Sequence, residues 1–382
     1  MRLKSVALFA GIGAIEHGLR RAGHSTELFC EIDQSARNVL ERRFSDVPIV
    51  EDVKSLKTLP ASDIVAAGFP CQDLSQAGRT KGINGSNSGL VRELFRLLQV
   101  AKRKPAWIIL ENVPFMLSLD CGKAMAMIID TLEELGYQWA YRTIDSRAFG
   151  LPQRRRRVFL LASRSEDPRA VLLNDDAAEP NAPLVARVPH GFYWTEGNSG
   201  LGWAIDAIPP LKGGSRLGIP SPPAIWFPKE RRLYTPDIRD AERLQGLPAG
   251  WTNGQPEEEG AGRARWRLVG NAVSVPVAEW IGRRLLDHRE YQENGSKPLC
   301  NSDRWPRAAW GRKGKVYEAH VSEWPVRRKY QGLDEFLRYP LQHLSARATA
   351  GFLKRITNST LKVDKAFVRD VRYHLSQVKK ER

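Results

Sequence analysis

The sequence predicts an α/β protein built around a doubly wound, mostly parallel sheet. Over the first 160 residues, short apolar runs typical of buried strands alternate with stretches whose apolar residues recur at helical spacing. Such alternation is typical of βαβ units, whose strands are parallel. After residue 163 Pro and Gly become frequent and clean periodicity is lost until about residue 237. A small irregular region of strands and loops is therefore expected to interrupt the α/β fold.

The expected elements follow one another along the chain. Strands are expected at residues 5–9, 27–30, 63–67, 107–110, 137–144 and 157–162, the last two as a hairpin-type pair. Helices are expected at residues 15–22, 35–44, 90–102, 125–135, 237–245, 272–286, 345–356 and 363–378. The composition shifts divide the chain into four regions, residues 1–163, 164–230, 231–286 and 287–382.

The charge of the chain indicates a polyanionic partner. Its 382 residues carry a formal net charge of +16, which favours nucleic acid first and a membrane surface second. A merely solubilising positive surface is the alternative. No apolar run approaches the 18 residues of a membrane span, and the N-terminus lacks the pattern of a signal peptide.

The four cysteines contain no C-x-x-C pair. We therefore expect no metal site, and we expect reduced thiols in a cytosolic protein. Cys71 is nevertheless notable, because Pro70-Cys71 follows the apolar run at residues 63–67. A strand that ends there presents a thiol at the carboxyl edge of the sheet, where open α/β proteins bind ligands. The thiolate can act as a nucleophile, although a buried structural cysteine is the usual alternative.

A glycine loop and an acid suggest a cofactor. Phe9, Gly11 and Gly13 lie between the first strand and the first helix, where glycines allow close approach of the backbone to a ligand. Glu31 ends the second strand, a common place for an acid that binds ribose hydroxyls. Together they favour an adenosyl-type cofactor over ordinary loop glycines.

Polar residues mark three further points. Glu111 follows another strand, so its carboxylate is expected at the same sheet edge as Cys71. In the run at residues 153–157, Gln153, Arg155 and Arg157 share one face if the run is a strand; a basic patch for phosphates is the alternative. Gly270-Asn271 is interpreted as a turn that leads into a helix.

In this order the motifs resemble those of the DNA (cytosine-5)-methyltransferase family, bacterial or phage type. The resemblance covers residues 3–163 and 231–286. It rests on residues 9–13, Glu31, residues 51–53, Pro70-Cys71-Gln72, Glu111-Asn112-Val113, Gln153-x-Arg155-x-Arg157, residues 243–246 and residues 270–273. The chain departs from the family at Ala7, where Asp is frequent, and in a slightly longer segment at residues 235–243.

The resemblance implies roles for these residues. Cys71 would add to C6 of a cytosine flipped out of duplex DNA, and C5 would then take a methyl group from S-adenosylmethionine. Glu111 would contact the base at N3 and N4, Arg157 would hold O2, and Gln153 and Arg155 would support the site. Residues 76–89 would form a closing loop. The residues implied to bind the cofactor are Phe9, Gly11, Gly13, Glu31, Ile32, Asp52, Pro70, Asn271 and Ala272.

The same resemblance implies a catalytic and cofactor-binding domain at residues 1–163, completed by residues 231–286, and a target-recognition segment at residues 164–230. Duplex DNA is the implied partner of a monomer in the bacterial cytosol, associated with the nucleoid. A cognate restriction endonuclease or other defence proteins are possible further partners. An RNA cytosine-5 methyltransferase, a non-catalytic nucleic-acid-binding scaffold and a nicotinamide dehydrogenase are the alternatives.

The basic C-terminal extension, residues 287–382, carries 21 Lys and Arg against 11 Asp and Glu. Its basic and aromatic residues predict an accessory module that grips DNA beside the target site. Loss of residues beyond Asp287 is then expected to weaken DNA binding and to spare cofactor binding. The alternative is an extension that packs against the large domain.

Overall fold

The computed structural model describes residues 2–69, 89–180, 188–213, 222–254, 261–287, 289–293, 295–299 and 304–381. They form two compact units. Unit 1 comprises Met1–Ala148, Arg156–Glu179 and Val273–Arg327, and unit 2 comprises Phe149–Arg155, Pro180–Ala272 and Arg328–Arg382. Pro70, Cys71 and residues 76–88 of the expected closing loop lie outside the described residues.

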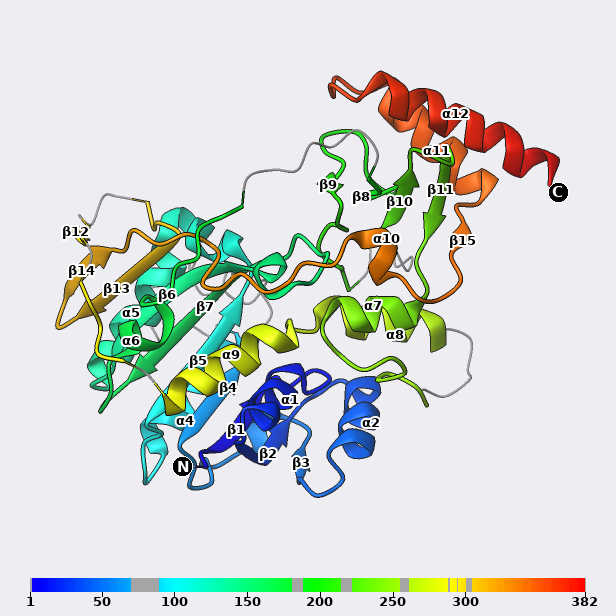
Figure 1. Cartoon of the computed structure of the whole chain (residues 1–382). Helices are drawn as coiled ribbons and strands as arrows, with labels where there is room; N and C mark the ends of the chain where they lie inside the picture. Colours follow the sequence, from blue (N-terminus) through cyan, green and yellow to red (C-terminus); the bar gives the residue numbers. More distant parts are fainter. Residues whose placement is uncertain are drawn as a thin grey trace. The chain divides into compact units, whose positions relative to one another are not determined.

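Unit 1 is built on a ten-stranded sheet with the order β12-β14-β13-β6-β7-β5-β4-β1-β2-β3 (Figure 1). Its strands are β1 (Lys4–Leu8), β2 (Ser25–Cys30), β3 (Ile49–Val50), β4 (Ile64–Ala67), β5 (Trp107–Asn112), β6 (Gln138–Asp145), β7 (Arg156–Ser163), β12 (Lys297–Pro298), β13 (Ala308–Arg312) and β14 (Lys315–Glu318). From β3 to β5 all neighbours are parallel, whereas β7 runs antiparallel to both β5 and β6. The predicted parallel sheet with a late antiparallel pair is confirmed.

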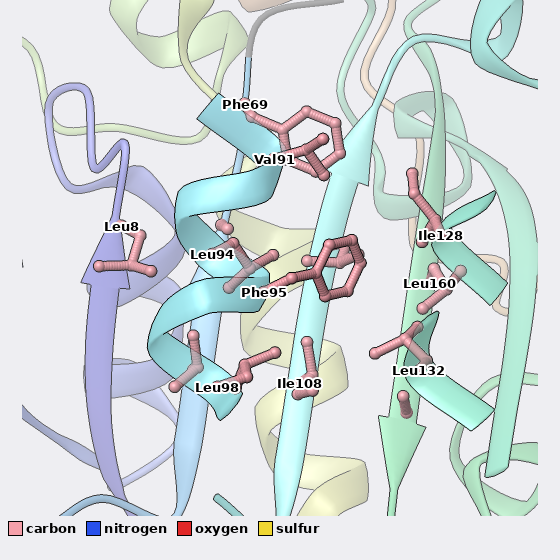
Figure 2. Packing of buried hydrophobic residues seen from close by; sticks show 14 of the residues in the cluster. Leu8, Phe69, Val91, Leu94, Phe95, Leu98, Ile108, Ile128, Leu132 and Leu160 are labelled. Atoms are coloured by element: carbon pink, nitrogen blue, oxygen red, sulfur yellow. The ribbon is translucent and has the colours of Figure 1, made fainter. Parts of the chain in front are cut away.

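Helices cover the sheet of unit 1. They are α1 (Ala14–Arg21), α2 (Gln34–Arg43), α4 (Leu90–Val100), α5 (Lys123–Glu134), α6 (Pro168–Leu172) and α9 (Val275–Leu286), with short 3-10 turns η1 (Val53–Ser55), η2 (Pro114–Leu117), η3 (Leu119–Gly122) and η4 (Ser146–Phe149). Alternate strand residues such as Leu8, Ile108 and Leu160 pack with Leu94 of α4 and Leu132 of α5 in one buried cluster (Figure 2). These strands are buried on both faces, and every second residue of each strand faces the apolar side of α4 and α5.

The first part of the C-terminal extension continues this sheet. β13 pairs antiparallel with β6, with Ala309 opposite Tyr141, and β14 and β12 follow outward. Trp305 contacts the rings of Trp139 and Tyr141, and the Tyr141 hydroxyl donates to the Pro306 carbonyl at 2.8 Å. The strands β12, β13 and β14 therefore extend one edge of the sheet of unit 1, as the packing alternative for the extension predicted.

Unit 2 holds a five-stranded antiparallel sheet with the order β15-β11-β10-β8-β9. Its strands are β8 (His190–Phe192), β9 (Ala204–Ile205), β10 (Ala224–Phe227), β11 (Arg232–Thr235) and β15 (Gln342–His343), and its helices are α7 (Ile238–Leu244), α8 (Ala261–Asn271), α10 (Leu333–Phe336), α11 (Ala346–Thr357) and α12 (Lys365–Lys380). The expected helices at residues 345–356 and 363–378 correspond to α11 and α12.

The last part of the C-terminal extension completes the core of unit 2. Phe352 of α11 and Phe367 of α12 are fully buried and pack with Phe192 and Trp226 of the small sheet. The strand β15 adds to β11, with His343 opposite Tyr234. Residues 287–382 are therefore divided between the two units and do not form a separate body.

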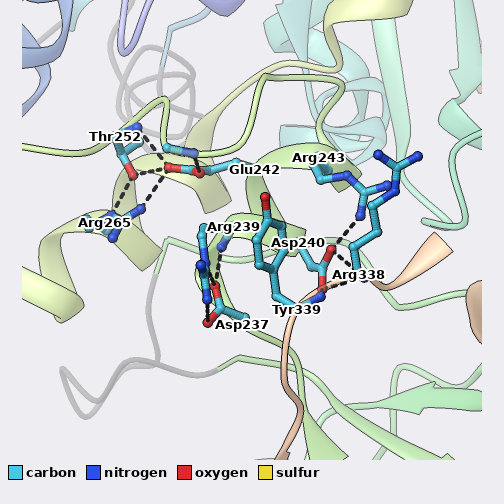
Figure 3. A network of polar contacts seen from close by, with 10 residues as sticks. Asp237, Arg239, Asp240, Glu242, Arg243, Thr252, Arg265, Arg338 and Tyr339 are labelled. Carbon is cyan, nitrogen blue, oxygen red and sulfur yellow. Dashed lines mark hydrogen bonds and ion pairs between the residues drawn. The ribbon is translucent and has the colours of Figure 1, made fainter.

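A polar network ties the extension to α7 (Figure 3). The Asp240 carboxylate is fully buried and accepts hydrogen bonds from the backbone amides of Arg338 and Tyr339 at 3.0–3.1 Å. The buried Glu242 carboxylate accepts from the Gly250 and Thr252 amides and pairs with Arg265 at 3.1 Å. Each buried carboxylate is satisfied, so the network holds its segments in place without an unpaired charge.

Two sequence expectations were wrong. Gly270 and Asn271 are the last residues of α8, a helix that the sequence interpretation missed, and the turn occupies the residues before α9. The helix expected from residue 272 begins at Val275, after a Ser274 N-cap.

Across the described ranges, the structure contains no helix with the length and apolar character of a membrane span.

Removal of one buried ring tests whether the extension belongs to the core. We expect Phe367→Ala to lower the free energy of unfolding by about 3–5 kcal/mol, the usual cost of emptying a buried Phe site. Chemical denaturation followed by circular dichroism measures it. Lys379→Ala, on an exposed position of the same helix, is the control and should change stability by less than about 0.5 kcal/mol. Equal stabilities of the two variants would contradict the assignment of α12 to the core.

Candidate active site

The parallel register brings four strand ends to one edge of unit 1. Leu8 of β1 pairs with Cys30 of β2 on one side and with Ala67 of β4 on the other. Ala67 in turn pairs with Leu110 of β5. The segments that follow these residues carry the glycine loop, Glu31, Gly68-Phe69 and Glu111, so the candidate residues from distant parts of the sequence leave the sheet together.

The glycine loop has the backbone conformation that its sequence requires. Phe9, Gly11 and Gly13 all have positive φ values, 56°, 55° and 72°. A side chain at Gly13 would collide with the Phe44 ring, with its Cβ only 2.6 Å away, whereas the space beside Gly11 is open. The loop therefore presents open backbone at Gly11, as close approach to a ligand demands.

Glu31 is fixed beside this loop. Its Oε2 accepts the Gly11 amide at 2.7 Å, and its Oε1 accepts the Asp33 amide at 2.8 Å. Burial raises the pKa of the Glu31 carboxyl, and these two hydrogen bonds partly offset that rise. Each carboxylate oxygen has a second lone pair, so the group can still accept hydrogen bonds from two ligand hydroxyls.

Ile32 and Asp52 are two further residues that the sequence analysis assigned to cofactor binding. Ile32 is 70% exposed, which leaves an apolar side chain available to cover a flat ligand. Asp52 begins η1 and its carboxylate accepts the Lys54 amide at 2.9 Å. The sequence interpretation missed Arg37, which is buried on α2 and donates to the carbonyls of Glu31 and Ile32 at 3.2 and 2.7 Å.

Glu111 and Arg157 form an ion pair at the edge. Arg157 Nε lies 3.1 Å from Glu111 Oε1, and both side chains are nearly buried. The Arg157 Nη1 also donates to the Arg156 carbonyl at 2.7 Å, which holds the guanidinium in place. The two opposite charges attract each other more strongly here than in water, because both side chains are nearly buried.

Two adjacent residues of β5, Glu111 and Asn112, lie beside the chain just before Cys71. The Asn112 side chain donates to the Phe69 carbonyl at 3.1 Å. A Cβ on Gly68 would lie 3.6 Å from Glu111 Oε2. Phe69 is the last described residue before Pro70-Cys71, so Glu111 lies beside the segment that leads into the cysteine. Asn112, which the sequence analysis included in a motif without giving it a role, anchors that segment.

Gln153 and Arg155 do not share a strand face with Arg157, contrary to the sequence expectation, because β7 begins only at Arg156. Both are buried in unit 2. Gln153 donates to the Leu244 carbonyl at 2.7 Å and accepts the Leu211 amide at 2.9 Å. Arg155 donates to the carbonyls of Leu211, Gly270 and Ala272 at 2.6–3.3 Å.

Asn271 and Ala272 also belong to unit 2. Arg155 holds the backbone on both sides of Asn271, and the Asn271 side chain lies against Gly213, where a Cβ would collide with it. The glycine at position 213 is therefore needed for this close approach.

No cluster of three or more His, Cys, Asp or Glu able to hold a metal occurs within the described part of the chain.

Comparisons with known proteins agree with this geometry. Residues 3–190 match the model of the C-5 cytosine-specific DNA methylase family. The chain is 51% identical over 370 residues to the Type II methyltransferase M2.BsuMI of Bacillus subtilis (strain 168), with 94% of each chain covered. It is 29% identical to M.NgoBI of Neisseria gonorrhoeae, covering 72% of this chain and 90% of that protein.

Solved structures share the fold. The S. pombe Dnmt2 methyltransferase superposes with a TM-score of 0.55 at 17% identity, covering 75% of this chain and 99% of that one. A putative DNA modification methyltransferase of an E. coli prophage gives 0.50 at 18% identity, covering 75% and 99%. The chain belongs to the C-5 cytosine-specific DNA methylases. It is a DNA cytosine-5 methyltransferase that uses S-adenosylmethionine. The class predicted from the sequence is therefore confirmed.

The role of Glu31 can be tested by calorimetry. We expect Glu31→Ala to weaken S-adenosylmethionine binding, because two hydrogen bonds to a charged acceptor are worth about 1.5–3 kcal/mol each before compensation. Glu27→Ala, within the strand β2 that Glu31 follows, is the control and should leave the affinity unchanged. Unchanged affinity in Glu31→Ala would refute its role in the cofactor pocket.

A buried acid on α1 gives a prediction on pH. Burial raises the pKa of Glu16 from 4.5 to about 8. Its folded pKa lies above its unfolded pKa, so the protonated form is favoured in the fold and stability is lost as pH rises from about 4.5 to about 8. We expect Glu16→Gln to gain stability relative to the wild type over this range, measured as melting temperature against pH. Exposed Glu134→Gln should show no such trend, and parallel curves for wild type and Glu16→Gln would contradict the prediction.

Proposed function

We propose that the strand ends of unit 1 methylate cytosine through a covalent bond between Cys71 and C6 of the base. The observation that carries the proposal is the contact of Glu111 and Asn112 with Gly68-Phe69, the segment that leads into Pro70-Cys71. A carboxylate and a thiol that leave adjacent strands at one edge can act on the same ring.

The proposed reaction makes and breaks one bond to the enzyme. Cytosine C5 is a weak nucleophile, so the Cys71 thiolate first adds to C6 and electron density moves to C5 and the N3 side of the ring. S-adenosylmethionine supplies the methyl group that C5 takes. Loss of the C5 proton to a base then expels the Cys71 thiolate and restores the aromatic ring. Because C6 is inaccessible in a stacked duplex, the cytosine is flipped out first.

Glu111 is proposed to contact N3 and N4 of this cytosine. Hydrogen bonding at N3 stabilises the charge that the ring acquires when the thiolate adds. The ion pair with Arg157 orients the carboxylate beside Gly68, and the same guanidinium is proposed to hold O2 of the base. Both residues then act on the substrate.

The residues of unit 1 fit S-adenosylmethionine. Open backbone at Gly11 suits a close ligand, the fixed Glu31 carboxylate suits ribose hydroxyls, and exposed Ile32 suits the adenine face. Phe9, Gly13, Asp52 and Pro70 are proposed to shape the same pocket. For Asn271 and Ala272, which belong to unit 2, a role in cofactor binding rests on the family resemblance alone. Gln153 and Arg155 are proposed as positioning residues, because their polar groups hold backbone carbonyls and amides around residues 211 and 270–272.

Unit 2 is proposed to recognise the DNA target. The resemblance assigns target recognition to residues 164–230, and the C-terminal helices share the core of the sheet that these residues form. Basic side chains of α11 and α12 are proposed to contact phosphates. We further propose a monomer on DNA in the bacterial cytosol, associated with the nucleoid, and a cognate restriction endonuclease or another defence protein as its functional partner.

Substitution of the proposed nucleophile has a sharp expected outcome. Cys71→Ser should abolish transfer of tritiated methyl groups to duplex DNA, because a serine hydroxyl is not ionised near neutral pH. Exposed Cys121→Ser is the control and should retain activity. Turnover by Cys71→Ser at the wild-type rate would contradict the covalent mechanism.

Changes at the ion pair test the contact with the base. Glu111→Gln and Arg157→Ala should each lower the single-turnover rate by about 10²-fold or more, the scale of losing an acid–base group or an anion-stabilising donor. S-Adenosylmethionine affinity should stay near that of the wild type and of the control Glu134→Gln. A large loss of cofactor affinity with unchanged single-turnover chemistry would overturn the assignment.

A further inference from the structure

Unit 2 contains a hollow of about 1090 Å³ that none of the roles above uses. It lies between the small sheet and the start of α12. Its walls are formed by residues of β8, β9 and β10, by the turn after β10, and by the segment that begins α12. The lining residues used below are His190, Trp203, Trp226, Lys229, Lys362 and Arg369.

Three rings form one wall of the hollow. His190 stacks on Trp203 with ring centroids 4.9 Å apart and on Trp226 at 5.2 Å, with interplanar angles of 26° and 28°. Phe367 of α12 supports Trp203 and Trp226 from its side at 4.9 and 5.2 Å. Trp203 is only half-buried, so the wall offers a rigid aromatic surface to an occupant.

Two residues of the wall carry polar atoms that lack a partner. His190 Nδ1 and Trp226 Nε1 are buried and have no hydrogen bond to any described residue. Buried polar atoms are rarely left unpaired in native proteins. Burial lowers the pKa of His190, so its ring is neutral at neutral pH and can both donate and accept.

The charges at the rim select an anion. Lys229 and Lys362 are exposed, and within the described residues neither makes an ion pair. The two carboxylates of the lining are engaged. Asp364 caps α12 by accepting the Ala366 amide at 2.6 Å. Asp370 pairs with Arg231 at 2.9 Å and with the lining residue Arg369 at 3.3 Å. A cationic ligand would be repelled by the two lysines, and it would find both carboxylates already engaged. An anionic ligand would be attracted by the lysines.

We propose that this hollow binds a nucleotide of a DNA strand, separate from the target cytosine. An aromatic wall stacks a base of any sequence, and Lys229 and Lys362 neutralise the attached phosphates. The volume exceeds that of a single base, so the sugar and phosphate fit with it. The inference rests on the proposed DNA-binding role of unit 2 and adds a defined contact outside the catalytic edge.

Photo-crosslinking locates the contact directly. The full chain is irradiated with a single-stranded hexathymidylate that contains one 5-iododeoxyuridine, and the modified peptides are identified by mass spectrometry. We expect adducts at Trp203, His190 or Trp226. Adducts only at other sites would overturn the proposal. Competition by free thymidine monophosphate as strong as by the oligonucleotide would overturn a DNA strand as the occupant and assign the hollow to free nucleotides.

Charge reversal tests the rim without disturbing the core. We expect Lys229→Glu with Lys362→Glu to weaken binding of the same oligonucleotide at least 10-fold. The slope of log affinity against log salt should fall by about 1.4, because each single-strand phosphate contact contributes about 0.7. The control, Lys313→Glu with Lys315→Glu at exposed positions of unit 1, keeps the net charge equal to that of the test variant. Equal binding by the two variants would overturn the proposal.

Methyl transfer separates this inference from the proposed function. If the hollow is a secondary contact, the variant with Lys229→Glu and Lys362→Glu retains single-turnover methylation of saturating duplex DNA, while its oligonucleotide crosslink is lost. Retained methylation with an unchanged crosslink would overturn only the proposal that the hollow binds a nucleotide. Absence of methylation in the wild type would overturn the proposed function, whatever the crosslink shows.

Discussion

The register of four parallel strands is the constraint on which the site depends. Leu8 is paired with Cys30 and with Ala67 at once, and Ala67 is paired with Leu110. A shift of one residue in any of these pairings would turn that strand's side chains to the other face of the sheet. It would also move Glu31 away from Gly11 or Glu111 away from Gly68. The buried side chains that fix the register therefore also fix the positions of the polar groups at the edge.

The polar groups at this edge are held by backbone contacts more than by one another. Glu31 accepts two main-chain amides, Arg37 donates to two main-chain carbonyls, and Asn112 donates to the Phe69 carbonyl. Such contacts position a carboxylate and leave its remaining lone pairs available to a ligand. In unit 2, the side chains of Gln153 and Arg155 likewise bind backbone groups, those of residues 211 and 270–272.

The sequence predicted local features well because they depend on neighbouring residues. Helical spacing located α1, α4 and α5, and the strand ends carrying Glu31 and Glu111 followed from short apolar runs. The role of the C-terminal extension depends on partners that are remote in sequence. Ala309 pairs with Tyr141, and Phe367 packs on Trp226, and no periodicity within the extension reveals either partner.

Two local interpretations failed for other reasons. The alternation of Gln153, Arg155 and Arg157 suggested one strand face, but β7 starts only at Arg156. The Arg154 amide donates to the Ile208 carbonyl, and the side chains of Gln153 and Arg155 bind the backbone of Leu211. Helix α8 was missed because it contains Gly262 and Gly270 and its arginines obscure the apolar stripe. Gly270 is required there by the close approach of the backbone at Lys212, which no local pattern encodes.

The most direct test of the account is to identify the residue that becomes bonded to the substrate base. Duplex DNA whose cytosines are replaced by 5-fluorocytosine prevents the final elimination, since fluorine cannot leave as the proton does. After reaction with S-adenosylmethionine, proteolysis and mass spectrometry should find the DNA adduct on the peptide that contains Cys71. An adduct on Cys30 or Cys121, or methyl transfer without any covalent adduct, would contradict a mechanism built on these strand ends.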